Sequence, residues 1–187
     1  MKRFLILFIG VAVVLRAFIL SGNIFSYHTS ISDREFRLVY SGEVTTLNYL
    51  TTATANEFSL LANFVDPLVE YDRFGKIQPA LAEEWTVSED GLIWTFKLRQ
   101  GVKWVNHEGK VYSPVTAQDF VDGLKYVLTS DNNSKTANIV YSMIKNAKEY
   151  YEKEIRDFNQ VGVKALDKYT LQYTLIKPIP YFLSTLT

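Results

Sequence analysis

The 187-residue sequence contains no cysteine, which excludes a disulfide framework, a thiolate nucleophile and a cysteine-ligated metal. Histidine occurs only at His28 and His107, so a histidine-rich metal site is excluded as well. The chain also has no excess of one charge, because its 20 basic residues equal its 20 acidic residues. This balance argues against nucleic acid as a partner, since proteins that coat nucleic acid need a basic surface.

Motifs that carry catalytic chemistry are missing too. The sequence has no glycine-rich phosphate loop and no serine in a nucleophile elbow. The paired acids at 83–84 and 89–90 are better explained as a solvated strand edge and a turn, because adjacent side chains of a strand point to opposite faces. The segment 131–134 (DNNS) lacks the glycine and the distal glutamate of a calcium loop. We therefore expect a protein that is not an enzyme and binds no cofactor or metal.

Apolar residues are abundant: 48% of the chain is hydrophobic and 14% is aromatic, enough for the core of one modest domain. The N-terminus begins with Lys2 and Arg3 and continues with an apolar run from residue 4 to residue 15, interrupted at Arg16. A basic start followed by such a run is typical of a secretory signal. We interpret residues 1–23 as a signal peptide or an N-terminal membrane anchor, and residues 24–35 as a linker.

Two elements are predicted before residue 66. The alternating segment 36–40 (FRLVY) predicts a short strand. Thr54 followed by Glu57 predicts a capping box at the start of a helix. The apolar stripe of that helix is expected to consist of Phe58, Leu61 and Phe64/Val65.

The three tryptophans fall between residues 85 and 104, with Lys and Arg residues between them. Aromatic rings interleaved with cations can stack on bases or sugars, so the parity of the strand decides between a binding surface and a core. Over residues 92–99, Trp94 shares its face with Leu92, Phe96 and Leu98, and the cations point the other way. Turn residues at 89–91 and 100–101 predict a three-stranded meander. We predict that all three tryptophans belong to the core.

The second half of the chain alternates helical and strand patterns. Thr116 and Asp119 predict the start of a helix with a buried stripe, and residues 139–155 predict a second amphipathic helix. A hairpin is predicted from strands 161–165 and 171–175, with a turn at 167–168. The whole pattern is that of an α+β unit with antiparallel pairing. The predicted stripe of the first helix comprises Phe120, Leu124, Val127 and Leu128.

Several stretches, in this order and at suitable spacing, resemble the extracellular solute-binding proteins of oligopeptide ABC importers. The most specific are the Pro-Ala-Leu-Ala-x-x-Trp element, the Asp-Gly-x-x-Trp-Thr-Phe-x-Leu-Arg hairpin and the Thr-Ala-x-Asp-Phe helix start. The likeness covers about four-fifths of the chain and is strongest for the streptococcal-type peptide-binding lipoproteins of family 5. The matching stretches are SGEVTTLNYL, GKIQPALAEEW, SEDGLIWTFKLRQGVKW, VTAQDFVDGLKYVL, VGVKALDKYTLQYTL and PIPYF.

The resemblance implies an α+β, periplasmic-binding-protein type II-like fold of two lobes that close on an extended peptide. It implies that residues 36–65 are the first strand and helix of the large subdomain of lobe I, that residues 66–187 are the small subdomain of that lobe, and that the second lobe is absent. The backbone that lines the peptide in the family falls on Ala53, Thr54 and Ala55 here, and Thr136 borders the cleft. Because Ala53-Thr54 replaces an acidic-glycine pair common at that point, only backbone contacts carry over.

The partners that the resemblance implies are oligopeptides and the ABC permease subunits in the membrane, at the outer face of the cell membrane. Lipoproteins of the family end their signal with a Leu-Ser-Gly-Cys-like sequence. In this chain Leu20-Ser21-Gly22 is followed by Asn23, which has no thiol for attachment of a diacylglyceryl group. We therefore expect that the apolar segment, and not a lipid, retains the protein at the membrane.

Two functions remain open at this point. The first is the substrate-binding component of an oligopeptide ABC transporter, which captures extended peptides outside the membrane for import and which, in this truncated form, is weak or inactive alone. The second is a membrane-tethered protein-interaction domain that binds no peptide.

Overall fold

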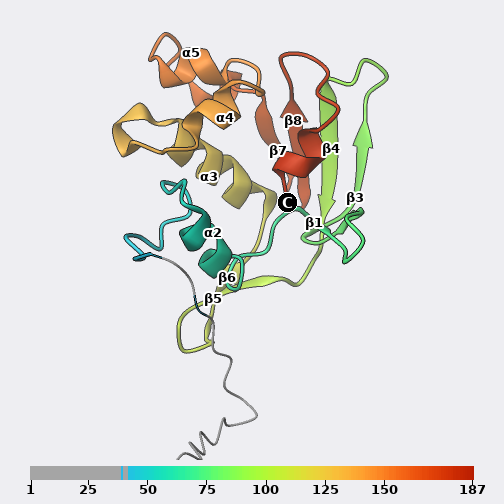
Figure 1. Cartoon of the computed structure of the whole chain (residues 1–187). Helices are drawn as coiled ribbons and strands as arrows, with labels where there is room; N and C mark the ends of the chain where they lie inside the picture. Colours follow the sequence, from blue (N-terminus) through green and yellow to red (C-terminus); the bar gives the residue numbers. More distant parts are fainter. Residues whose placement is uncertain (1–38, 40–41) are drawn as a thin grey trace, which may run out of the picture. The chain divides into compact units, whose positions relative to one another are not determined.

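The computed structural model describes residue 39 and residues 42–187 (Figure 1). The chain divides into two compact units, Met1–Tyr40 and Ser41–Thr187, and all elements named below belong to the second unit. The predicted signal or anchor (1–23), the linker (24–35) and nearly all of the predicted strand 36–40 lie outside the described residues.

The main sheet consists of four antiparallel strands in the order β3-β4-β8-β7. Two hairpins build it: β3 (Ala82–Val87) with β4 (Ile93–Leu98), and β7 (Val163–Asp167) with β8 (Thr170–Thr174). The two hairpins join through β4 and β8, where Trp94 pairs with Tyr173 and Phe96 pairs with Leu171. The predicted hairpin of the second half is thus confirmed.

The predicted three-stranded meander is wrong at its third strand. β5 (Lys103–Val105) leaves the main sheet and pairs with β6 (Val111–Pro114) in a separate two-stranded sheet. The chain reverses after β4 at Gly101, whose φ of 81° favours glycine. Instead of β5, β8 pairs with β4 in the main sheet, because the apolar face of β8 extends the buried face of β4. A second two-stranded sheet pairs β1 (Val69–Tyr71) with β2 (Ile77–Pro79).

Helix α3 (Ala117–Leu128) packs against β7 and β8 and begins as predicted. The Oδ2 atom of Asp119 accepts a hydrogen bond from the backbone N–H of Thr116 at 2.7 Å, which completes the capping box. The predicted stripe is also confirmed, because Val127 and Leu128 are buried and the other two members pack against the core.

The single helix predicted over residues 139–155 is two short helices, α4 (Ala137–Tyr141) and α5 (Ala147–Tyr151). Between them, Asn146 adopts a left-handed conformation with φ 58°. Ile144 forms an isolated β-bridge with Leu175. Main-chain bonding to the end of β8 therefore overrides the local helical pattern, as tertiary context often does.

Helix α2 (Ala55–Leu61) starts where predicted, but its details differ from the prediction. Leu61 is buried, whereas Phe58 and Phe64 are 40% and 73% exposed, so the predicted apolar stripe is wrong at these two residues. The capping box is also wrong. The backbone N–H of Thr54 donates to the side chain of Thr52 and not to that of Glu57. Three short 3-10 helices complete the fold: η1 (Ser130–Asn132), η2 (Phe158–Gln160) and η3 (Phe182–Thr185).

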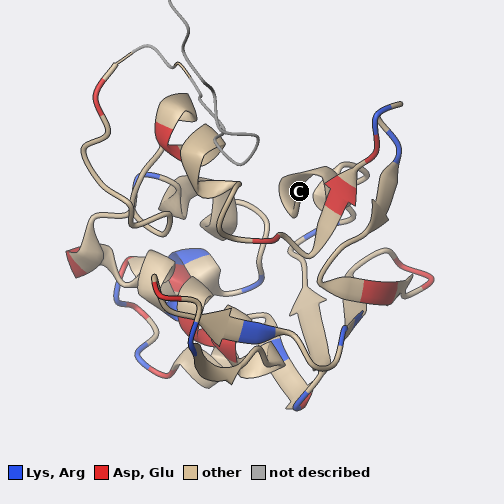
Figure 2. Cartoon of the chain, turned by 90° about the horizontal axis from the view of Figure 1, so that it is seen from below, with Lys and Arg blue, Asp and Glu red and all other residues tan. Residues whose placement is uncertain are grey.

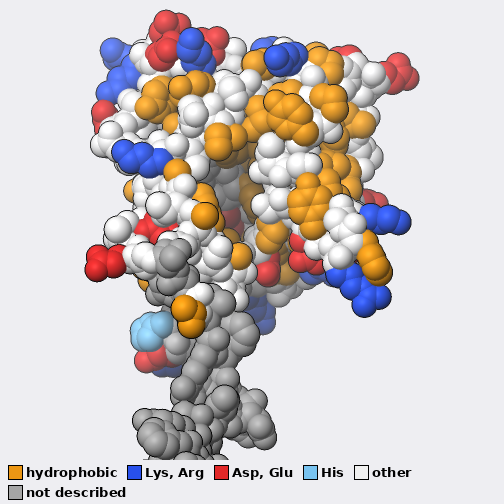
Figure 3. Space-filling model, in the orientation of Figure 1, with side chains coloured by type: hydrophobic (Ala, Val, Ile, Leu, Met, Phe, Trp, Pro, Cys, Tyr) orange, Lys and Arg blue, Asp and Glu red, His pale blue; other side chains and the backbone are white. Residues whose placement is uncertain are grey.

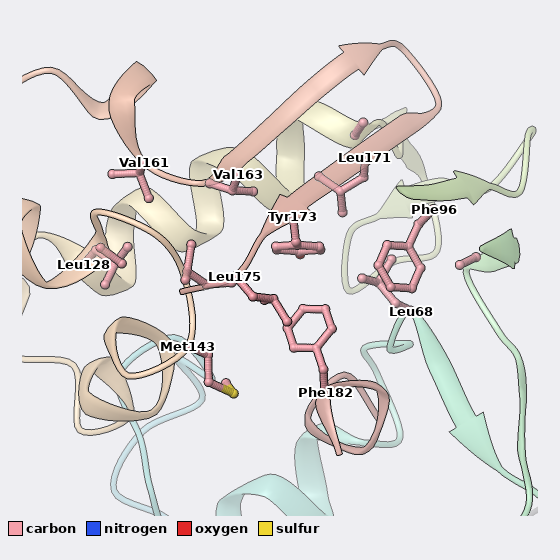
Figure 4. Close-up of a cluster of buried hydrophobic side chains, with 14 of the residues drawn as sticks. Leu68, Phe96, Leu128, Met143, Val161, Val163, Leu171, Tyr173, Leu175 and Phe182 are labelled. Carbon is pink, nitrogen blue, oxygen red and sulfur yellow. The ribbon is translucent and has the colours of Figure 1, made fainter. Parts of the chain in front are cut away.

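The core centres on three rings that point toward one another, Phe96, Tyr173 and Phe182 (Figure 4). The ring centroids of Phe96 and Tyr173 are 5.9 Å apart at 83°, and those of Tyr173 and Phe182 are 5.6 Å apart at 71°. These are edge-to-face arrangements, which aromatic quadrupoles favour. The aromatic centre of the core thus comes from β4, β8 and η3.

The tryptophans lie where the strand parity predicted. Trp85 and Trp94 are half-buried and pack against the core, with Trp94 5.4 Å from the ring of Phe182. Trp104 is half-buried in β5, and its Nε1 donates to Asp119 Oδ2 at 3.3 Å. The prediction of a core role is thus confirmed for Trp85 and Trp94, whereas Trp104 lies outside the main core, in the separate β5–β6 sheet.

Candidate functional site

The predicted lining residues lie at the end of a segment rich in threonine, residues 45–54 (TTLNYLTTAT), which we call the threonine loop. Ala53 and Thr54 are its last two residues, and Ala55 follows it. Its middle lies along one face of α3. Asn48 Nδ2 donates to the hydroxyl of Tyr126 at 3.3 Å, and Leu50 lies against Gly123. Gly123 and Tyr126 are three residues apart and so share a helix face. The helix therefore forms a floor beneath the middle of the loop.

Tyr49 of the threonine loop lies near the same face of α3. Burial, and then the nearby carboxylate of Asp119, raise the pKa of the Tyr49 hydroxyl above its ordinary value. Asp119 is four residues before Gly123, so it belongs to the same row of α3. The direction of this shift means that Tyr49 stays neutral at physiological pH.

A second segment, residues 134–136, binds the other side of the loop. Ser134 is buried, and its hydroxyl donates to the carbonyl oxygen of Leu50 at 2.6 Å. The backbone N–H of Lys135 donates to the carbonyl of Thr51 at 3.1 Å. The hydroxyl of Thr136 is 3.2 Å from that of Ser134. The structure therefore brings Thr136 close to the threonine loop, although the two segments are far apart in sequence.

Both ends of the threonine loop converge on the carboxylate of Glu57, which is only 2% exposed. Its Oε1 accepts from the backbone N–H and the hydroxyl of Thr45 at 2.7 and 2.6 Å, and from the N–H of Thr46 at 3.0 Å. Its Oε2 accepts from the hydroxyl of Thr54 at 2.6 Å and from the hydroxyl of Thr52. Five donors thus satisfy one carboxylate and tie the two flanks of the loop together.

These hydrogen bonds hold the pKa of the Glu57 carboxyl well below its ordinary range. The bond from the Thr45 hydroxyl contributes most, followed by the hydroxyls of Thr52 and Thr54 and the N–H of Thr45. Hydrogen bonds to the charged form stabilise that form, and here they outweigh the opposing effect of burial. Glu57 is therefore ionised at every physiological pH.

The lining residues themselves are open to solvent: Ala53, Thr54 and Ala55 are exposed, and Thr136 is half-buried. Within the part of the chain that the structure describes, neither the backbone N–H nor the C=O of Ala53 has a hydrogen-bond partner. An unpaired main-chain donor and acceptor on an exposed segment can pair with another extended chain. The geometry at Ala53 is thus suited to main-chain recognition.

A concave region lies away from the threonine loop. It is a polar hollow of about 370 Å³ at one end of the main sheet. Its lining carries three carboxylates and one lysine, so it is acidic on balance. The lining comes from β3, β4 and the β7–β8 hairpin: Glu83, Glu84, Lys97, Leu98, Gln100, Asp167, Tyr169 and Thr170.

Charge and hydrophobic exposure do not mark a single binding face. Basic and acidic residues are interspersed along the chain (Figure 2), as the balanced composition led us to expect. On the face shown in Figure 3, exposed hydrophobic side chains occur in several separate groups. Within residues 42–187, no group of acidic and histidine side chains is placed to hold a metal ion. The helices of that same region are all too short or too polar to span a bilayer.

Solved structures with the same arrangement are solute-binding proteins. OppA of Listeria monocytogenes bound to peptide superposes with a TM-score of 0.70 at 26% identity, over 79% of this chain and 28% of that chain. The periplasmic oligopeptide-binding protein OppAIV of Borrelia burgdorferi gives a TM-score of 0.68 at 31% identity, over 75% and 27%. The fold is therefore a part of the α+β fold of this class of proteins, as predicted.

Sequence relatives specify the family. The oligopeptide-binding protein AliB of Streptococcus pneumoniae is 45% identical over 155 residues, which are 83% of this chain and 24% of AliB. The periplasmic OppA of Escherichia coli is 34% identical over 67% of this chain and 22% of its own length. Residues 76–187 match the family described as bacterial extracellular solute-binding proteins, family 5 Middle. The chain belongs to this family, and it spans about a quarter of the length of the curated relatives it matches.

The resemblance pointed to the predicted lining residues, but the contacts of Glu57 and Ser134 with the threonine loop were not anticipated. Glu57 was assigned to a capping box, because Thr-x-x-Glu before an apolar run is the signature of one. Ser134 was considered only as part of the segment 131–134, which lacks features of a calcium loop. The high threonine content of residues 45–54 was the available signal, since hydroxyls need acceptors and Glu57 is the nearest carboxylate downstream in the chain.

Proposed function

We propose that this chain is part of the substrate-binding component of an oligopeptide ABC transporter. It captures extended peptides outside the membrane and delivers them to permease subunits. Residues 36–65 contribute to the large subdomain of the first lobe, and residues 66–187 form its small subdomain. The apolar N-terminal segment retains the protein at the membrane without a lipid, because Asn23 occupies the position of the acylated cysteine in relatives.

The observation that supports this function is the state of the Ala53 backbone. Ala53 is exposed, and its N–H and C=O are without partners in the described part of the chain, while the loop before it is held by Glu57 and Ser134. A peptide recognised through its main chain can have any sequence, because every residue except proline offers the same donor and acceptor. Ala53, Thr54 and Ala55 supply backbone groups, and Thr136 borders the same cleft.

Binding, not catalysis, is the chemistry that suits this arrangement. The lining consists of small side chains and backbone, with no titratable acid or base among the four residues to activate the hydroxyls of Thr54 and Thr136. One side of a cleft also provides only part of the hydrogen bonds that an extended peptide needs. Ordering the peptide costs conformational entropy that such a half-site does not offset.

Calorimetry on two polypeptides tests this function. The 187 residues alone should bind mixed oligopeptides no more tightly than about 1 mM, or about −4 kcal/mol. A hybrid in which these residues replace the matching segment of AliB should bind at least 100-fold more tightly, because the remainder of AliB supplies the opposing side of the cleft. Micromolar binding by the 187 residues alone would refute the half-site model.

Two variants of the hybrid locate the contact. Ala53→Pro removes the backbone N–H donor and should weaken binding at least tenfold. Ala53→Ser keeps the donor and should change the affinity less than twofold. A folded hybrid that binds no peptide would contradict the proposed function, because it would show that Ala53-Thr54 is incompatible with a peptide.

A further inference from the structure

Glu57 is outside the proposed lining, yet it is the most heavily hydrogen-bonded side chain near it. It is buried, and all five of its donors belong to the threonine loop. A helix cap needs at most one or two of these bonds. The arrangement therefore does more than start α2.

We propose that Glu57 is the positioning residue of the peptide site: its carboxylate clamps both flanks of the threonine loop and so sets the backbone of Ala53 for peptide recognition. This inference rests on the proposed function. It adds a residue that contacts no peptide but determines whether the contacting backbone is ordered before the peptide arrives.

The positions of the donors support the clamp. Thr45 and Thr46 precede Glu57 by 12 and 11 residues, while Thr52 and Thr54 precede it by 5 and 3. Each carboxylate oxygen binds one flank: Oε1 accepts from the donors of the first flank and Oε2 accepts from those of the second. The carboxylate thus closes the loop on itself.

The other anchors of the loop act at different positions. Ser134, Lys135 and Tyr126 bond residues 48–51, the middle of the loop. Ala53 lies outside that anchored middle, between Thr52 and Thr54, which both donate to Oε2. Apart from the local bond from the N–H of Thr54 to the hydroxyl of Thr52, order at Ala53 therefore depends on Glu57 on both sides.

A carboxylate is the side chain that this geometry requires. Ionised, it only accepts, and its two oxygens offer about four lone-pair directions. The amide of glutamine has one acceptor oxygen and one NH2 group, which would face either the backbone N–H groups of Thr45 and Thr46 or the hydroxyls of the second flank. Backbone N–H groups cannot turn to accept, so glutamine keeps its oxygen on the first flank and turns its NH2 group to the second. There the hydroxyls of Thr52 and Thr54 must change from donors to acceptors and lose their bonds to a charged oxygen, which weakens the hold on the second flank.

The test compares Glu57→Gln with Asp90→Asn. Asp90 is a matched control, because it is also a carboxylate with a lowered pKa that accepts from a nearby hydroxyl (Ser88) and a backbone N–H (Leu92), but it lies in the β3–β4 turn. Peptide affinity is measured by calorimetry on the AliB hybrid, and amide hydrogen exchange is measured on the full 187-residue chain.

We expect Glu57→Gln to weaken peptide binding at least tenfold and to speed exchange at Thr54 at least tenfold. Exchange at Tyr173 in the main sheet should stay within twofold. Asp90→Asn should leave the peptide affinity within twofold of that of the unmutated hybrid, even if it lowers the unfolding midpoint as much as Glu57→Gln does. Should Glu57→Gln not fold, Thr45→Val removes one donor and keeps the carboxylate, and we expect it to weaken binding about threefold.

Two results would overturn the clamp: Glu57→Gln with an unchanged affinity, or an equal loss of affinity in Asp90→Asn, which would mean that general destabilisation is the cause. Both outcomes are distinct from failure of the proposed function, in which the unmutated hybrid itself does not bind peptide.

Discussion

The main sheet and the threonine loop are stabilised in opposite ways. The sheet buries aromatic and aliphatic side chains from two hairpins, and Phe96, Leu171 and Tyr173 are at most 4% exposed. The loop has few buried apolar groups and depends on hydrogen bonds, most of them to the carboxylate of Glu57 and the others to Tyr126, Ser134 and Lys135. The main sheet forms the core of the fold, whereas the proposed contact with peptide lies in the threonine loop, which polar groups hold in place.

This difference has a physical basis. Apolar burial is non-directional and tolerates small shifts, so it suits a scaffold. Hydrogen bonds to a charged acceptor have narrow geometry and therefore fix a backbone in one conformation. The loop must be both exposed and ordered, and a buried carboxylate beneath it satisfies both conditions.

The largest effect is expected in the sheet. Phe96 is fully buried at the centre of the aromatic cluster. Phe96→Ala should lower the free energy of unfolding by about 3–5 kcal/mol, because it removes buried contacts and leaves a cavity. Urea denaturation measures this change. Tyr112→Ala, at a residue that is 85% exposed, is the control and should stay within about 0.5 kcal/mol. A loss below about 1 kcal/mol for Phe96→Ala would mean that the sheet does not dominate stability.

A smaller effect is expected where two backbones meet. A methyl group on Gly162 would collide with the backbone carbonyl oxygen of Thr174 and lie 3.0 Å from Lys145 Cβ and 3.1 Å from Thr174 Cβ. Gly162→Ala should therefore cost about 1–3 kcal/mol through overpacking. Gly123 in α3 is the matched control, since its added methyl would lie 3.8 Å from Leu50. Gly123→Ala should stabilise the protein by about 0.5–1 kcal/mol, because alanine has the better helix propensity. Equal effects of the two variants in denaturation would contradict the close approach at Gly162.

The smallest effect on global stability, and the clearest contrast between the two regions, concerns pH. The folded pKa of Glu57 is lowered, so the ionised carboxylate stabilises the closed loop fully above the ordinary pKa of about 4.3, and this contribution is lost as the pH falls toward the folded value. Amide protection at Thr45 and Thr46 should thus be constant between about pH 7 and 5 and decrease below about pH 4.

Tyr173 in β8 provides the internal comparison for that measurement, since its amide lies in the central strand pair. Its protection should decrease less over the same range, although Asp90 and Asp167, whose pKa values are also lowered, affect the two hairpin turns. In Glu57→Gln the pH dependence at Thr45 should disappear. A parallel decrease at Thr45 and Tyr173 in the unmutated protein would show that the loop does not open independently of the sheet.

Much of the sheet could be predicted from the sequence. Strand parity placed Trp94, Phe96 and Leu98 on the buried face, and turn residues located both hairpins. The partner of β4 could not be predicted, because parity specifies a face and not a neighbour. The break at Asn146 was also missed, since the hydrophobic period of residues 139–155 is helical and only the bridge to Leu175 interrupts it.

The candidate site was less predictable. Ala53, Thr54 and Ala55 have no distinctive side-chain chemistry, so only the resemblance to a family pointed to them. The anchoring of the middle of the threonine loop by Ser134 depends on a contact with Leu50 across 84 residues of sequence, which no local pattern contains. Glu57 was recognised as a carboxylate but was assigned to a capping box at Thr54. The capping-box pattern covers four consecutive residues, so it does not include the more distant donors Thr45, Thr46 and Thr52.

The join between β4 and β8 also determines the order in which the molecule can form. Thr95 and Gln172, which pair at its centre, are 77 residues apart. Each hairpin is local and can form as soon as it is synthesised, but the sheet cannot close until β8 exists. At the usual 5–20 residues per second of synthesis, β4 waits about 4–15 s for its partner. Pairing at such separation raises the contact order and slows folding. During that interval the apolar face around Phe96 lacks its principal cover, so the unfinished chain is most prone to aggregation between the completion of its first hairpin and the completion of its second.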